Sequence, residues 1–300
     1  MSAPYQVRVP SSTSNLGPGF DLLGLCLDLY LHVELRCEEA SEKRDDFAKL
    51  GGEARGLPTG PGNMVLRAFD ALCLHEGRSA PLGRIWSMDS QIPVARGLGS
   101  SGAATAAGLL LACQVLGIDP EPHQNVLVQL GTRLEGHPDN VVASLLRGCV
   151  LTIQSQPEFR VLRQPIHPDL AFAVAWGSTP LPTATSRQCL PAQIPFDQAL
   201  DQPRRLAALL EGLRNADPVL LRHARTEHLH QHVRLPLIPG AAEALEAAHN
   251  AGAHLATISG SGSSLVAIGS HERAPAIAEA LGQALTKADA PAHWQVVQPV

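Results

Sequence analysis

Residues 93–111 read Pro-Val-Ala-Arg-Gly-Leu-Gly-Ser-Ser-Gly-Ala-Ala-Thr-Ala-Ala-Gly-Leu-Leu-Leu, a glycine- and serine-rich loop that passes directly into an alanine- and leucine-rich helix. Glycines let backbone N–H groups come close to a ligand, and a helix N-terminus adds unpaired donors and the positive end of its dipole. No acidic side chain interrupts Gly97–Ala104, so a phosphate meets no repulsion there. The loop by itself fits a phosphate site, and it fits equally a glycine-rich turn before a buried helix.

The same loop matches the letters of a dinucleotide-binding motif, because Gly97, Gly99 and Gly102 have the spacing Gly-x-Gly-x-x-Gly. That motif requires a βαβ unit with an acidic residue about 20 positions further on, at the end of a second strand. Asp119 is the nearby acidic residue, but it follows a predicted helix rather than a strand. We therefore expect no dinucleotide, and no Walker loop either, because Gly-Lys-Ser/Thr is absent after the glycines.

Composition indicates a compact enzyme: the chain has 300 residues, of which 45% are hydrophobic and 17% charged. A net charge of -5 gives no support to nucleic-acid or anionic-membrane binding. The 6 cysteines are scattered without a Cys-x-x-Cys, which favours free thiols in a reducing compartment over disulfides or zinc. Neither an apolar signal core nor an apolar run of about 18 residues is present, so a cytoplasmic location is expected.

Alternating leucine and valine over 25–36, with polar residues mostly between them, predict a strand with one buried face. Tyr5–Val9 is expected to be a short strand that ends at Pro10, followed by a polar loop over 11–19. The charged segment 38–62 is expected to be a surface excursion such as a hairpin. Helices are predicted over 63–75, after the glycine loop, and over 124–134, 141–146, 183–190, 198–213, 241–250 and 274–285; strands are predicted over 84–88, 149–153, 159–162, 170–176, 253–259, 265–268 and 293–297.

Two domains are expected, because prolines cluster over 154–168 and the pattern of elements starts again beyond them. The second half has the order strand, helices, strand, strand, helix, strand, which is the split βαβ order of a ferredoxin-like domain. We place the domains at 1–160 and 161–300.

Several motifs point to one family. The segment Pro93-x-x-x-Gly-Leu-Gly-Ser-Ser-x-Ala resembles the nucleotide loop of the superfamily of galactokinase, homoserine kinase, mevalonate kinase and phosphomevalonate kinase, the GHMP kinases. Further motifs, spread over most of the chain in the expected order, are similar to those of the homoserine kinases within that superfamily. They are Pro10-Ser-Ser-Thr-Ser-Asn-Leu-Gly-Pro-Gly-Phe-Asp-Leu-Leu-Gly24, Glu135-Gly-His-Pro-Asp-Asn-Val141, Thr183-x-x-x-Arg187-x-x-Leu-Pro191, Leu229-His-Gln-x-x-Arg234 and Ser259-Gly-Ser-Gly262.

The resemblance implies an α+β fold of two domains, the two-domain GHMP kinase fold. Its N-terminal domain has a mixed sheet and binds the nucleotide, and its C-terminal domain is a ferredoxin-like α/β sandwich. It also implies an ATP- and Mg²⁺-dependent phosphotransferase of threonine biosynthesis, which transfers the ATP γ-phosphate to the side-chain hydroxyl of L-homoserine and gives O-phospho-L-homoserine. A homodimer is implied as well.

The resemblance also assigns roles to residues. The implied ATP-binding residues are Asn63, Pro93, Arg96, Gly97, Leu98, Gly99, Ser100, Ser101, Gly102 and Ala103. The implied metal ligands are Ser100 and Glu135, although Arg133 stands where relatives have another acidic residue. The implied substrate-binding residues are Asn15, Asp21, His137, Asp139, Thr183, Arg187, Arg234 and Gly260, and the implied catalytic residues are Asp139, Asn15 and Arg187.

Within this set, Arg187 and Arg234 match a clamp for the substrate carboxylate, which suits the planar guanidinium, and Asp21 matches the residue that faces the amino group. Asp139 either accepts the proton of the hydroxyl or only orients it. Asn63 also fits a helix N-cap, and Glu135 also fits a plain helix-terminal carboxylate.

Two other functions stay open: a related kinase with a mevalonate-type or sugar alcohol acceptor, and a nucleotide-binding regulator without catalysis. Asp21, Arg187 and Arg234 favour homoserine over mevalonate, because mevalonate has no ammonium group to pair. The intact glycine loop, together with Asn15 and Asp139, favours catalysis.

Overall fold

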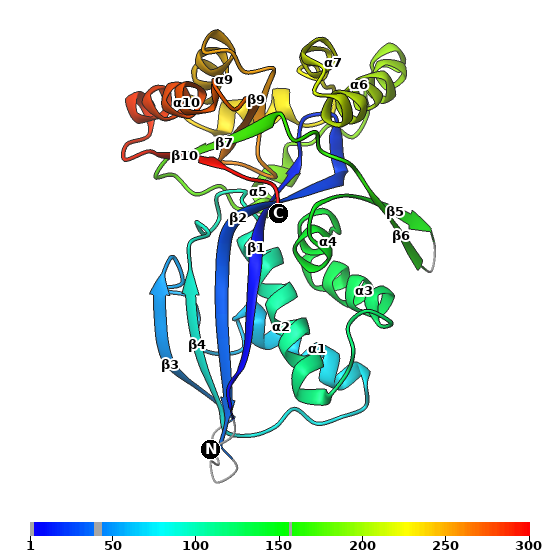
Figure 1. Ribbon diagram of the computed structural model, residues 1–300, viewed down its shortest axis with the longest axis vertical. Helices are drawn as coiled ribbons and strands as arrows, with labels where there is room; N and C mark the ends of the chain where they lie inside the picture. Colours follow the sequence, from blue (N-terminus) through cyan, green and yellow to red (C-terminus); the bar gives the residue numbers. More distant parts are fainter. Residues whose placement is uncertain (1–2, 39–43, 156–157) are drawn as a thin grey trace.

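The computed structural model describes residues 3–38, 44–155 and 158–300. Within them the chain folds into two sheets with associated helices, one in the lower and one in the upper half of the elongated molecule (Figure 1). The sheets are connected by the long strand β2 (Gly19–Cys37), whose beginning lies beside the second sheet and whose end reaches the far tip of the first (Figure 1).

The first sheet is mixed, with the strand order β3-β4-β2-β5-β6 and with β1 paired to the other edge of β2. Strands β3 and β4 are parallel, and the remaining pairs are antiparallel. The alternating leucines and valines of β2 are all buried, as the period of two predicts. The other strand bounds are β1 (Tyr5–Asn15), β3 (Asp45–Gly52), β4 (Arg84–Ser90), β5 (Cys149–Ser155) and β6 (Glu158–Arg163).

Four helices of the N-terminal half pack on this sheet and bury its leucine face. They are α1 (Met64–His75), α2 (Ser100–Leu116), α3 (Gln124–Glu135) and α4 (Asp139–Leu146). Small residues on α2 let the backbones come close together: a Cβ at Gly108 would lie 2.2 Å from the carbonyl oxygen of Val65 on α1. The alanine- and glycine-rich composition of α2 is therefore a packing requirement as well as a helix signal.

The second sheet is antiparallel with the order β10-β7-β9-β8, which is the ferredoxin-like order predicted for this half. Its strands are β7 (Leu170–Trp176), β8 (Leu255–Ile258), β9 (Leu265–Ser270) and β10 (His293–Val297). The other elements of this half are α5 (Thr183–Gln188), α6 (Phe196–Asn215), α7 (Pro218–His223), α8 (Gln231–Arg234), the 3-10 helix η1 (Leu235–Leu237), α9 (Ala241–Asn250) and α10 (Ala274–Ala288). The fold class expected from the sequence, two-domain α+β, is confirmed.

The N-terminal strand corrects one prediction. Strand β1 does not end at Pro10 but continues to Asn15, so Ser11–Asn15 is strand rather than loop. Among the described residues β1 pairs with β2 alone, so a proline without an N–H is tolerated in it, and the register shifts between Pro10 and Ser11. The consequence is that Ser11–Asn15 pairs with β2, and this pairing fixes the position of the polar motif.

The charged segment 38–62 contains the edge strand β3, which pairs in parallel with β4 and is therefore no hairpin; residues 39–43 lie outside the described part. Helices α7 and α8 were not expected from the sequence.

Strand β6 runs across residue 160, and Pro299 pairs back to Leu27 of the first sheet. The domain division at 160 stays a prediction. No helix in the described ranges is long and apolar enough to cross a membrane.

Candidate active site

A cavity of about 330 Å³ lies where the two halves of the molecule meet. Its lining combines residues of β1, β2, α2 and α4 with residues of α5, α8 and the turn before β9. The predicted site residues that line it are Asn15, Asp21, Asn63, Arg96, Gly97, Gly99, Ser100, Ser101, His137, Asp139, Thr183, Arg187, Arg234 and Gly260. The predicted residues outside that lining are Pro93, Leu98, Gly102, Ala103 and Glu135.

The glycine loop is held in a backbone shape that only glycine permits. Gly97 and Gly99 have φ values of 77° and 71°. A Cβ would lie 2.2 Å from the Ser259 carbonyl oxygen at Gly97, and 2.1 Å from Ser12 Oγ at Gly99. Gly99 is the N-cap of α2, and no side chain caps that end. The first N–H groups of α2 are therefore available beside the cavity, which is the donor arrangement that binds phosphate.

The side chain of Arg96 connects the glycine loop with the second half of the chain. Its guanidinium donates to the carbonyl oxygens of Val94 at 3.1 Å, Gly177 at 3.1 Å and Ser178. Gly177 and Ser178 follow β7, so Arg96 ties the glycine loop to the second sheet. We conclude that Arg96 holds the loop in place, while its contact with ATP stays a prediction.

The end of the cavity near α1 is mostly apolar. Asn63 is the N-cap of α1: its side chain accepts from the N–H of Val65 at 3.0 Å and donates to the Pro58 carbonyl at 2.8 Å. The N-cap role is therefore confirmed, and the adenine role stays a prediction. The apolar residues at this end, which sequence reasoning missed because no local pattern marks them, are Leu31, Leu57, Met64, Met88 and Val94.

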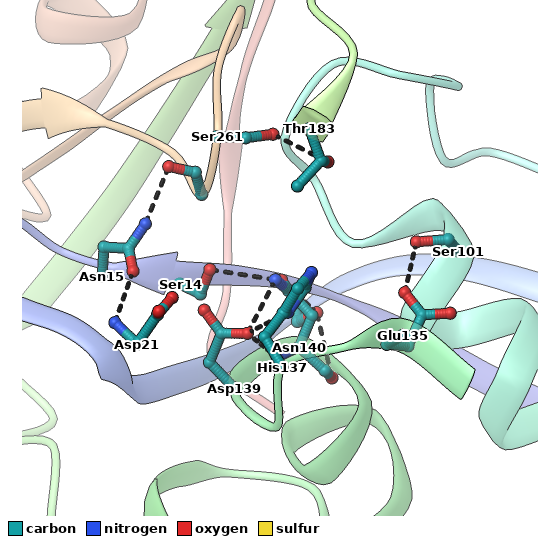
Figure 2. A network of polar contacts seen from close by, with 12 residues as sticks. Ser14, Asn15, Asp21, Ser101, Glu135, His137, Asp139, Asn140, Thr183 and Ser261 are labelled. Carbon is teal, nitrogen blue, oxygen red and sulfur yellow. Dashed lines mark hydrogen bonds and ion pairs between the residues drawn. The ribbon is translucent and has the colours of Figure 1, made fainter. Parts of the chain in front are cut away.

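Glu135 ends α3 beside the first turn of α2 (Figure 2). Its carboxylate accepts from Ser101 Oγ at 2.6 Å and from Thr105 Oγ1 at 2.6 Å. Arg133, two residues earlier, is exposed. The carboxylate is therefore fixed next to the hydroxyl-rich start of α2, which gives a cluster of hard oxygen donors.

Asp139 lies at the centre of a polar network in the first turn of α4 (Figure 2). It is 2% exposed, and its Oδ1 contacts His137 Nδ1 at 2.7 Å and accepts from the N–H of Asn140 at 2.9 Å. Burial by itself raises the pKa of Asp139, but hydrogen bonds from His137, Ser14 and the Asn140 N–H outweigh it and hold the pKa below its ordinary value. Asp139 is therefore ionised at neutral pH.

Its partner His137 shows the opposite shift. Burial lowers the pKa of His137, and the hydrogen bond with Asp139 outweighs that effect, so its pKa lies above the ordinary value. Asn140 completes the network by donating to Ser14 Oγ at 3.0 Å and accepting from Ser12 Oγ at 3.0 Å. Sequence reasoning missed Ser14 and Asn140 as site residues, although each directly adjoins a predicted one.

Asn15 links the end of β1 to the glycine turn between β8 and β9. Its backbone has a φ of 71°, its Nδ2 donates to the Gly260 carbonyl at 2.8 Å, and its Oδ1 accepts from the N–H of Asp21 at 3.0 Å (Figure 2). The side chain thus joins the N-terminal motif to the glycine turn before β9. Thr183 Oγ1 lies 3.3 Å from Ser261 Oγ in the same turn.

Two residues of opposite charge form an ion pair in the cavity wall. Arg187 of α5 donates to both carboxylate oxygens of Asp21 on β2, at 3.0 and 2.6 Å. Burial lowers the pKa of Arg187, and the hydrogen bonds and charge of Asp21 outweigh this and raise it. Arg234 is 1% exposed and donates to the carbonyl of Gly260 at 3.2 Å. Both guanidiniums lie near the ring of Phe20, at 6.0 and 5.2 Å from its centroid. The far end of the cavity is therefore rich in charge.

Comparison with known proteins agrees with this arrangement. The family description "GHMP kinases N terminal domain" matches residues 63–148, and "GHMP kinases C terminal" matches residues 209–287. The homoserine kinase of Moorella thermoacetica is 39% identical over 282 residues, which cover 94% of this chain and 92% of that protein. The homoserine kinase of Thermosynechococcus vestitus is 37% identical over 292 residues, which cover 97% of this chain and 95% of that protein.

Solved structures extend the comparison to the fold. The crystal structure of homoserine kinase from Cytophaga hutchinsonii superposes with a TM-score of 0.87 at 28% identity, covering 100% of this chain and 96% of that one. The Methanococcus jannaschii mevalonate kinase structure gives a TM-score of 0.72 at 12% identity, covering 100% and 99%, and so shows the shared fold alone.

Proposed function

The chain belongs to the GHMP kinase family, and from this premise we infer that it is a homoserine kinase, an ATP-dependent phosphotransferase. The reaction transfers the γ-phosphate of ATP to the side-chain hydroxyl of L-homoserine and yields O-phospho-L-homoserine and ADP, a step of threonine biosynthesis. One observation carries the choice of acceptor: Asp21 and Arg187 meet in the cavity beside Arg234, so the site holds both signs of charge. A zwitterionic amino acid uses both, whereas a mevalonate or sugar acceptor has no ammonium group.

We propose that the triphosphate lies against the glycine loop and the start of α2, where Gly97, Gly99 and the uncapped N–H groups form an anion site. The apolar end near Met64 and Asn63 takes the adenine. The acceptor then lies at the charged end, with its carboxylate on Arg187 and Arg234 and its ammonium on Asp21.

The residues at the start of α2 fit a magnesium ion. Mg²⁺ prefers oxygen ligands, retains several waters and needs few protein groups, and Glu135 offers a carboxylate fixed by two hydroxyl donors. Ser100 supplies a hydroxyl at the cavity wall. We propose that Ser100 and Glu135 hold the ion, which supplies neutralisation of the phosphate charge when bound. Arg133 is exposed, and we propose no role for it in holding the ion.

Asp139 is proposed to orient the acceptor hydroxyl. Phosphoryl transfer has a loose transition state, so positioning and electrostatic stabilisation contribute more than early proton removal. A general base is most effective when its pKa lies near the working pH, and the hydrogen bonds of Asp139 hold its pKa lower than usual. The hydroxyl oxygen therefore forms its bond to the γ-phosphorus while the bond to the ADP oxygen breaks, and the proton leaves late to the transferred phosphate.

A substrate panel tests the function. ADP release, coupled to NADH oxidation, is measured with L-homoserine, mevalonate and galactose at equal concentrations. We expect turnover with L-homoserine alone. Turnover with mevalonate or galactose instead would support the alternative acceptor, and no turnover with any of the three would support a regulator. The homodimer and the cytoplasmic location implied by the resemblance, and the domain division at 160, stay predictions.

A further inference from the structure

At the charged end of the cavity, Asp21 and Arg187 serve as counter-ions for each other. The two Nη atoms of Arg187 each reach one carboxylate oxygen of Asp21, at 3.0 and 2.6 Å, which is the bidentate geometry of a strong ion pair. The two side chains are 34% and 36% exposed, and both line the cavity, so a ligand can reach them. In the free protein each charge is therefore already neutralised by the other.

The pair is held in place from the Asp21 side. Asp21 has a φ of 54°, a backbone conformation that residues other than glycine rarely adopt, and its N–H donates to Asn15 Oδ1 at 3.0 Å. Asn15 is itself anchored on Gly260. The backbone of Asp21 is thus held independently of the ion pair, so its carboxylate remains within reach of the site when Arg187 leaves it.

Arg234 adds a further positive charge beside the pair. Its guanidinium donates to the carbonyls of Ser186 and Gly260, and in residues 3–38, 44–155 and 158–300 no carboxylate forms an ion pair with it. Burial lowers the pKa of Arg234, and the positive charge of Arg187 lowers it further. A ligand carboxylate is therefore attracted by two guanidiniums, of which one is already satisfied by Asp21.

On the premise of the proposed function, we propose that the amino-acid acceptor binds by ion-pair exchange, in which its carboxylate replaces Asp21 on Arg187 and its ammonium replaces Arg187 on Asp21. Each protein charge then changes one counter-ion for another, and none is left unpaired. A ligand with a carboxylate alone breaks the pair and leaves Asp21 without a counter-ion, and a ligand with an ammonium alone does the same to Arg187. The free site therefore selects against singly charged ligands by its own ion pair.

This exchange predicts a gain of affinity from the loss of a charge. In Asp21→Asn the guanidinium of Arg187 is free, so 4-hydroxybutanoate, which is homoserine without its ammonium, no longer has to break an ion pair. We expect it to bind Asp21→Asn about fivefold more tightly than the wild type, the effect of removing one partly exposed pair. Homoserine binds the same variant more weakly. The loss of one negative charge also favours any anion in a general way, so the comparison is made at about 1 M salt, where the Debye length is about 3 Å. Independent contacts would leave the affinity for 4-hydroxybutanoate unchanged under that condition.

The test is isothermal titration calorimetry of the full chain with homoserine, 4-hydroxybutanoate and 3-aminopropan-1-ol, which is homoserine without its carboxylate. Arg187→Gln is the mirror variant, and it should bind 3-aminopropan-1-ol more tightly than the wild type does. Glu34→Gln is the matched control, because it removes the Glu34–Arg36 pair of 2.8 Å on the same strand, β2, outside the cavity. It should leave all three affinities as they are.

The exchange is overturned if two results occur together. The wild type phosphorylates homoserine, and a folded Asp21→Asn binds 4-hydroxybutanoate no more tightly than the wild type does. A wild type that does not turn over homoserine contradicts the proposed function instead, so the two failures are distinct. Circular dichroism checks the fold of each variant. Where Asp21→Asn does not fold, Arg187→Gln with 3-aminopropan-1-ol decides in the same way.

Discussion

Replacement of Asp139 by asparagine tests how the acceptor hydroxyl is held. The amide keeps an oxygen for the Asn140 N–H, which donates at 2.9 Å, but it removes the negative charge that contacts His137 and that we propose orients the hydroxyl. A hydrogen bond to a charged group contributes about 1.5–3 kcal/mol. At about 1.4 kcal/mol per tenfold in rate, the orienting role predicts that kcat falls roughly 10- to 100-fold.

The measurement is steady-state ADP release at saturating ATP and homoserine, beside a thermal unfolding curve. Ser144→Ala is the matched control: Ser144 is a buried polar residue of the same helix, α4, which donates to the Pro10 carbonyl at 3.2 Å and lies outside the cavity lining. It should lower stability by about 1 kcal/mol and leave kcat unchanged.

Two results would refute the orienting role of Asp139. A folded Asp139→Asn with a kcat near that of the wild type would remove Asp139 from the chemistry. A loss beyond about 10³-fold, equal in Asp139→Asn and Asp139→Ala, would instead indicate a general base, because such bases contribute about 10²–10⁴-fold. The intermediate loss, larger in the alanine variant, is the expected result.

Three further predictions concern the neighbouring elements. Asn63→Ser keeps the N-cap of α1 and removes the amide, so the KM for ATP should rise with little change in Tm, whereas Asn63→Ala should also lose about 1 kcal/mol of unfolding free energy. An unchanged KM in the serine variant contradicts the adenine role. Thr105→Val removes a 2.6 Å donor to Glu135, so half-maximal activity should need more Mg²⁺, with Thr105→Ser restoring the wild-type requirement; equal requirements in both variants contradict this. The pair of Asp139 and His137 stabilises the fold between the ordinary pKa values of about 3.9 and 6.5. Its lowered Asp139 pKa makes the contribution fade as pH falls below that range, and its raised His137 pKa makes it fade as pH rises above it. The Tm difference between wild type and His137→Gln should therefore be larger at pH 5.5 than at pH 8.5. A Tm difference that does not change with pH would show that the ion pair does not stabilise the fold.

Local patterns of apolar residues predicted most of the secondary structure, because their spacing follows which face of each element is buried. The period of two in β2 and the helical spacing in α1 each state which face of one element is apolar. The same reasoning failed at Pro10, where the missing N–H was read as a strand end. What the proline does there depends on whether β1 has a neighbour on its second edge, and that is a property of the sheet.

The candidate site was also predictable in its local motifs and not in the contacts between them. Its motifs were visible as short strings, and similarity to homoserine kinases over nearly the whole chain identifies the family. The sequence could not show that Arg96 donates to the carbonyl of Gly177 after β7, or that Thr105 donates a hydrogen bond to the carboxylate of Glu135. Both contacts join residues that are distant along the chain, and their distances are set by how whole elements pack.

By itself, then, the sequence determined the family, the alternation of strands and helices and the motifs that supply part of the cavity wall, because each is encoded in spacing along the chain. Only the tertiary structure decided which of those residues touch. Asp21 and Arg187 stand 166 positions apart, and the ion pair between them forms because β2 and α5 meet at one end of the cavity. No local pattern specifies that meeting, since it follows from the packing of the two halves against each other.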